Sequence, residues 1–184
     1  MIKVRTDDLD VKIAGEKPSV DIRRNKNATV QNSSVSSEQI KGAKAVGKTV
    51  AESFIADAET EVDAEFRDYD MILQRRLLLS FTATAGFEQY ICDDTLVGIA
   101  QKSFLDTVNK HDPELYKTSG DTGAFSFYYL AFRRGSETER RIGQTFAMLC
   151  SHDGDPIFQE LGEALYCWFL SLVRKAVNAN LNKS

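Results

Sequence analysis

From Ser36 onward, apolar residues recur every three or four positions, which is the spacing of an amphipathic helix. Ser36 and Gln39 have the spacing of a capping box at the start of this pattern. No proline interrupts the pattern, so we expect one long helix that includes residues 38–70. Its inward face would be formed by Ile40, Ala43, Val46, Val50, Phe54, Ala58, Val62, Phe66 and Tyr69.

The middle of the chain predicts further helices. Residues 71–91 are apolar on more than one side, as is typical of a central buried helix. Asp94 or Thr95 would cap a third helix, which ends before Asp112, a residue that precedes a proline. Residues 124–132 are rich in aromatic side chains that suit a strand, but the neighbouring helices and polar flanks favour a helix.

Two more helices are predicted near the C-terminus. Ser136 and Glu139 again have the spacing of a capping box, and Asp155 precedes Pro156 as an N-cap residue. Residues 1–35 alternate only weakly between apolar and polar side chains, which predicts an extended or weakly β arm. The sequence therefore predicts a mainly α fold: a single-domain bundle of about six helices over 36–184, behind an N-terminal arm over 1–35.

Composition narrows the class of protein. The 184 residues are 42% hydrophobic and 27% charged, as in an ordinary globular domain. A net charge of −4 argues against a general nucleic-acid binder, and no apolar run approaches the roughly 20 residues of a membrane-spanning helix. The three cysteines form no CxxC pair, and the first residues contain no apolar signal segment, so we expect a cytoplasmic protein.

One string has the form of a phosphate-binding loop. Gly42, Gly47, Lys48 and Thr49 fit G-x-x-x-x-G-K-[ST], and the string 42–49 resembles the P-loop of nucleotide hydrolases over these eight residues. In such a loop, backbone amides surround the phosphates while the lysine neutralises them and the hydroxyl binds magnesium. Because the apolar helical stripe continues through the string, we expect a helix there. Nucleotide binding at Gly42–Thr49 remains an alternative hypothesis.

The two histidines suggest a second alternative. His111-Asp112 and His152-Asp153 pair an imidazole with a carboxylate, both of which are common metal ligands. If the two segments met, they could form the metal site of a metal-dependent hydrolase. Each histidine is also predicted to end a helix, where a cation interacts favourably with the helix dipole. We favour the interpretation that the histidines end helices, and it predicts no metal or other cofactor.

Other side chains carry weaker signals. Arginine pairs at 23–24, 75–76, 133–134 and 140–141 could bind phosphate or an acidic partner, although solvent-exposed faces also explain them. Aromatic residues at 125–132 and 166–169 could line a pocket, but packing in the core is the simpler explanation.

The first long helix has an unusual order of charges. Lys41, Lys44 and Lys48 lie in its first half, whereas seven acidic residues lie between 57 and 70, opposed only by Arg67. This order is the reverse of the one that the helix dipole favours. An antiparallel copy of the helix would place lysines beside carboxylates at both ends.

This charge order predicts a homodimer through helix 38–70, with an apolar seam that includes Val50, Phe54 and Val62. No convincing catalytic set is present in the sequence. We therefore expect a small cytoplasmic helical interaction or regulatory protein that has no catalytic activity and self-associates.

Overall fold

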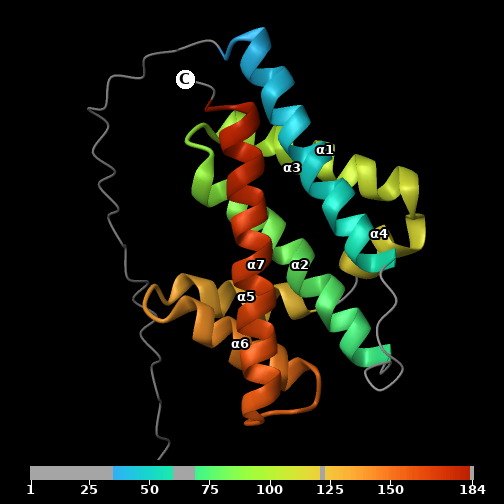
Figure 1. Cartoon of the computed structure of the whole chain (residues 1–184), viewed down its shortest axis with the longest axis vertical. Helices are drawn as coiled ribbons and strands as arrows, with labels where there is room; N and C mark the ends of the chain where they lie inside the picture. Colours follow the sequence, from blue (N-terminus) through green and yellow to red (C-terminus); the bar gives the residue numbers. More distant parts are fainter. Residues whose placement is uncertain (1–34, 60–68, 121–122, 183–184) are drawn as a thin grey trace, which may run out of the picture. The chain divides into compact units, whose positions relative to one another are not determined.

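The computed structural model describes residues 35–59, 69–120 and 123–182. Within these ranges the chain forms seven α-helices and no strand, which confirms the predicted mainly α fold (Figure 1). The predicted arm, apart from Val35, and residues 60–68 of the predicted first helix lie outside these ranges. None of the described helices is long and apolar enough to cross a membrane. The helices are α1 (Ser37–Glu59), α2 (Tyr69–Tyr90), α3 (Asp94–His111), α4 (Pro113–Gly120), α5 (Ala124–Arg133), α6 (Thr138–Leu149) and α7 (Pro156–Asn180).

Helix α2 lies at the centre of the fold and contacts each of the other six described helices. From Leu77 to Phe87 every residue is buried except Thr84, which is partly buried. The hydroxyl of Thr82 donates a 2.7 Å hydrogen bond to the carbonyl oxygen of Leu78, so burial leaves this group paired. A helix that is apolar on all sides is stable when other helices surround it. The prediction of a central buried helix is therefore confirmed.

The apolar stripe of α1 is covered by α3 and α7. Val50 and Phe54 are 0% and 1% exposed. The Phe54 ring packs against Phe104 of α3 and Phe169 of α7, with centroid distances of 5.6 and 6.5 Å. The prediction that Val50 and Phe54 form the seam of a dimer is therefore wrong, because helices of the same chain already bury them. Val62, the third predicted seam residue, lies outside the described ranges.

Most predicted helix caps are present. Ser36 and Gln39 exchange two hydrogen bonds of 2.9 and 3.2 Å, as the capping box requires. Asp112 and Asp155 each accept backbone N–H bonds from the first turn of the following helix, where a proline occupies the first position. The cap of α3 is Asp93 rather than Asp94 or Thr95, and it accepts bonds from two backbone amides.

Further details differ from the sequence-based expectation. Tyr69 and Asp70, predicted as the end of the first helix, are the first residues of α2. The short helix α4 adds one element to the predicted bundle of about six. The predicted capping box at Ser136 is also wrong, because Glu137 is the N-cap of α6, in a left-handed conformation with φ of 54°. The Ser136 hydroxyl instead lies 3.5 Å from the guanidinium of Arg141. The turn between α5 and α6 is therefore one residue longer than predicted, and α6 begins at Thr138.

Candidate functional site

The string that resembles a phosphate loop lies inside α1. Residues 42–49 belong to one uninterrupted helix over Ser37–Glu59, so their backbone amides bond to carbonyl groups of the same helix. A phosphate loop requires such amides to be free and to converge on the ligand. Gly42, Gly47, Lys48 and Thr49 are therefore placed on a helix, not on a loop that surrounds phosphates.

The two glycines of the string allow close contact between helices. A Cβ added at Gly47 would collide with the carbonyl oxygen of Ala100 in α3. A Cβ added at Gly42 would lie 2.6 Å from the carbonyl oxygen of Asn180 at the end of α7. The absence of a side chain at these positions lets α3 and α7 approach the backbone of α1. This packing explains both glycines without a nucleotide.

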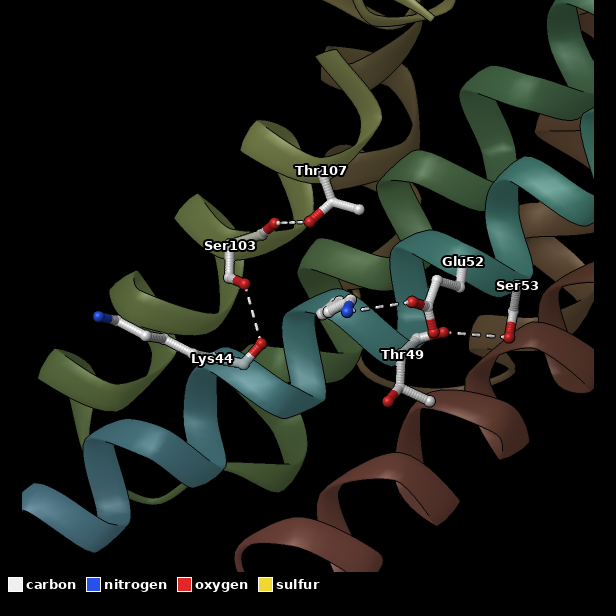
Figure 2. Close-up of polar contacts among 7 residues, drawn as sticks. Lys44, Thr49, Glu52, Ser53, Ser103 and Thr107 are labelled. Atoms are coloured by element: carbon white, nitrogen blue, oxygen red, sulfur yellow. Dashed lines mark hydrogen bonds and ion pairs between the residues drawn. The ribbon is translucent and has the colours of Figure 1, made fainter. Parts of the chain in front are cut away.

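Polar contacts join α1 to α3 beside Gly47 (Figure 2). The Ser103 hydroxyl donates a 2.8 Å hydrogen bond to the carbonyl oxygen of Lys44, while the Lys44 side chain extends away from Ser103. The Lys48 amine lies 3.6 Å from the Glu52 carboxylate one turn along α1. Thr49 is exposed, and its carbonyl oxygen accepts a 3.2 Å bond from Ser53. The polar groups of the string thus interact within and between helices.

A groove of about 670 Å³, which we call the lysine groove, runs between α1 and α3 at this position. Lysine ammonium groups dominate its charge, and all four of these lysines are exposed. Asp106 is the one carboxylate in its lining, so the groove attracts anions. The lining consists of Lys44, Lys48, Ile99, Lys102, Ser103, Asp106, Thr107 and Lys110.

Farther along the same side, α1 contributes carboxylates while α3 continues with the cationic Lys110 and with His111. A second hollow of about 370 Å³ shares Thr107 and Lys110 with the lysine groove and adds Glu52 and Glu59. His111, at the end of α3, lies 3.6 Å from the Glu59 carboxylate. The two hollows together form what we call the charged face. Lys44, Lys48 and Lys102 define its basic end, and Glu52 and Glu59, which lie beside Lys110 and His111 of α3, define its acidic end.

The two His-Asp pairs lie in different surroundings. His111 faces Glu59, whereas the ring of His152 stacks on Phe158 of α7 at a centroid distance of 3.7 Å. The Asp112 carboxylate caps α4, and Asp153 lines a groove between α5 and α6. Among the residues that the structure describes, no group of three or more His, Cys, Asp or Glu side chains could hold a metal ion.

Two of the four lysines of the lysine groove could be recognised from the sequence. Lys44 and Lys48 were visible in the reversed charge order of the first helix, whereas Lys102 and Lys110 on α3 were not singled out. Their spacing of eight residues places them on one side of a helix, which is the signal that the sequence offered. Their pairing with α1 depends on the crossing at Gly47, which is a tertiary contact.

No known protein family, no characterised protein and no solved structure matches the chain. The function must therefore be inferred from the site itself.

Proposed function

We propose that this chain is a non-catalytic helical interaction or regulatory protein that forms a homodimer through its charged face. The observation that carries the proposal is the order of charge that α1 presents on this face, with Lys44 and Lys48 before Glu52 and Glu59. A two-fold interface brings each surface patch against another part of the same surface in the second copy. A face with opposite charges at its two ends is self-complementary under that symmetry.

The geometry of the dimer follows from this pairing. In an antiparallel arrangement, Lys44, Lys48 and Lys102 of one copy approach Glu52 and Glu59 of the other, and the reverse contact forms at the opposite end. The order of charge in α1, which is unfavourable to the dipole of its own helix, thus forms attractive contacts between the two chains. Of the charges in the original prediction for helix 38–70, which paired Lys41, Lys44 and Lys48 with the carboxylates of 57–70, this proposal keeps Lys44, Lys48 and Glu59. Glu52 and, from α3, Lys102 are new contributors.

The strength of the dimer should differ from that of an apolar coiled coil. Val50 and Phe54 are buried inside one chain, so exposed charges rather than an apolar seam hold the copies together. Exposed ion pairs contribute about 0–1 kcal/mol each and are screened by salt. We therefore expect a weak dimer that dissociates at high ionic strength and is tuned by solution conditions. Cys92, Cys150 and Cys167 form no disulfide in the described part of the chain, which suits the cytoplasmic location that we propose.

Sedimentation equilibrium with charge-reversal variants tests the proposal. A basic-end variant (Lys44→Glu, Lys48→Glu, Lys102→Glu) and an acidic-end variant (Glu52→Lys, Glu59→Lys) should each be monomeric, because like charges then meet at both contacts. An equimolar mixture should form a heterodimer, because both contacts again join opposite charges. Raising the salt from about 0.05 to about 0.5 M should dissociate the wild-type dimer.

A control variant separates the charged face from total charge. Lys117→Glu, Arg174→Glu and Lys175→Glu change three exposed cations on α4 and α7 and should leave the dimer unchanged. A wild-type protein that stays monomeric at about 100 μM in low salt would overturn the proposal. The same holds for a mixture of the two variants that remains monomeric.

A further inference from the structure

A second groove lies between α5 and α6, away from the residues of the charged face. Its volume is about 310 Å³. One wall is formed by α5 and the residue that follows it, the other by α6, and Asp153 closes one end. The lining consists of Phe127, Leu130, Ala131, Arg134, Arg141, Gln144, Thr145, Met148 and Asp153.

Large apolar side chains of this groove face the solvent. Phe127 is 48% exposed, Leu130 is 60% exposed and Met148 is 41% exposed. Single exposed apolar residues are common on protein surfaces, but these three line one hollow. A contiguous apolar patch with a polar rim is typical of an interaction site.

The cations of the groove lie at one end. Residues 134–137 join α5 to α6, so the two helices run antiparallel, and Arg134 and Arg141 both lie near this connection. Phe127 and Met148 lie toward the opposite end, nearer to Asp153. The groove therefore presents an arginine end and an apolar end, and its ligand must have a matching order of chemical groups.

Arg141 has unused hydrogen-bonding capacity. Its Nη1 atom is buried and has no hydrogen-bond partner among the residues that the structure describes, while Nη2 lies 3.5 Å from the Ser136 hydroxyl. A buried donor without an acceptor destabilises a protein, and a guanidinium forms its strongest pairs with carboxylates. Nη1 is closed to solvent, so a carboxylate at this end of the groove would pair with the exposed Arg134 and with the part of the Arg141 guanidinium that lines the groove.

From these features we infer that the α5–α6 groove binds an amphipathic segment of another protein. The apolar side chains of that segment pack on Phe127, Leu130 and Met148, and acidic residues at one of its ends pair with Arg134 and Arg141. Two antiparallel helices leave a furrow into which the side chains of a third helix can pack, so we assign the segment a helical conformation. The assignment rests on charge complementarity and is independent of the dimer, which uses α1 and α3.

Fluorescence anisotropy with a labelled helical peptide tests this inference. The probe carries leucines on one face and three glutamates at its C-terminal end, and the matched control peptide carries lysines in place of the glutamates. We expect the acidic peptide to bind at micromolar concentrations and the lysine peptide to bind at least tenfold more weakly. Leu130→Glu and Arg134→Glu should each weaken binding of the acidic peptide at least tenfold, since both residues are exposed and line the groove.

Matched variants outside the groove serve as controls. Leu105→Glu replaces a leucine of α3 that is 39% exposed, and Arg174→Glu replaces an exposed arginine of α7, so both should bind the peptide as the wild type does. Equal affinity for the two peptides, or equal losses in the groove and control variants, would overturn the inference. If Leu130→Glu instead converts a wild-type dimer to monomer, the occupant is a second copy of the chain and the inference is likewise wrong.

Discussion

Gly47 of α1 lies directly against the carbonyl oxygen of Ala100 in α3, with no space between them for a side chain. The Ser103 Cβ lies 2.8 Å, and the Phe104 backbone nitrogen 2.9 Å, from the position that a Cβ of residue 47 would take. Backbone atoms cannot move away as a flexible side chain can. The crossing of α1 and α3, and with it the lysine groove, therefore depends on a glycine at this position.

Gly47→Ala should lower the free energy of unfolding by about 1–3 kcal/mol, because the added methyl group forces the two helices apart. Gly98→Ala is the matched control in α3, since nothing lies within 4 Å of the position of its added Cβ. There the gain in helix propensity should stabilise the protein by about 0.5–1 kcal/mol. Urea denaturation followed by circular dichroism measures both changes. Two variants of equal stability would contradict the packing argument.

We expect no binding of Mg-ATP or Mg-GTP by the wild-type protein or by Lys48→Ala. The amides of residues 42–49 are engaged within α1, so they cannot converge on phosphates. Lys48 is exposed and has a single ion pair with Glu52, so its loss should change stability by less than about 0.5 kcal/mol. Isothermal titration calorimetry is the measurement. Micromolar binding that disappears in Lys48→Ala would restore the nucleotide hypothesis.

Arg75→Met should destabilise the protein through the carboxylate that it leaves behind. The Arg75 guanidinium makes two hydrogen bonds of 2.6 and 3.0 Å with Asp57, whose side chain is 8% exposed, and thereby ties α2 to α1. Losing the partner of a largely buried carboxylate should lower the free energy of unfolding by about 1.5–3 kcal/mol. The double variant Arg75→Met, Asp57→Leu should recover part of that loss.

A double-mutant cycle on the same pair gives the coupling between the two side chains. Urea denaturation of wild type, both single variants and the double variant supplies the four free energies. Strict additivity of the two single changes would show that the pair contributes nothing.

The protein should lose stability in alkali through buried tyrosines. Burial raises the pKa of Tyr128 well above its ordinary value, with a smaller contribution from Cys150, and burial also raises the pKa of Tyr166. Above pH about 10 the unfolded chain releases tyrosine protons that the folded chain keeps, so unfolding becomes more favourable as pH rises. The slope is about 1.4 kcal/mol per pH unit for each proton kept.

Tyr128→Phe isolates the contribution of one ring. The Tyr128 hydroxyl has no hydrogen-bond partner within the described part of the chain, so its removal should be neutral or stabilising at pH 8. Between pH 8 and pH 11 the variant should lose less stability than the wild type, because one raised pKa is gone. Denaturation curves at the two pH values measure this difference, and parallel losses in both proteins would contradict it.

Local signals explain why the helices were predictable. The Ser36–Gln39 box, the proline after Asp155 and the apolar spacing of α1 all act within a few residues, and the structure contains each of them. The central helix was visible because its residues are apolar in all directions. The wrong prediction of a capping box at Ser136 also has a local cause. Gly135 and Glu137, on either side of Ser136, adopt left-handed backbone conformations in place of the expected capping box.

The sites depend on which surfaces remain uncovered, and the sequence alone does not determine that. In α5, Tyr128 is buried whereas Phe127, its neighbour, is 48% exposed, although both belong to the same aromatic cluster. The packing of α5 against α2 determines which of the two rings is buried. The Phe81 ring of α2 stacks on the Tyr128 ring, with 5.4 Å between the ring centroids. The two grooves likewise arise between helices, so neither is encoded in a single segment.

The contacts of α2 with all six other described helices also determine when its apolar surface is covered during synthesis. Its neighbours include α1 near the start of the described chain and α7 at its end. While the ribosome is still making α7, the residues of α2 that α7 will cover, such as Gly86 opposite Val173, face water. The nascent chain therefore carries an open apolar surface until α7 emerges, and a chaperone that binds apolar segments would have its target there.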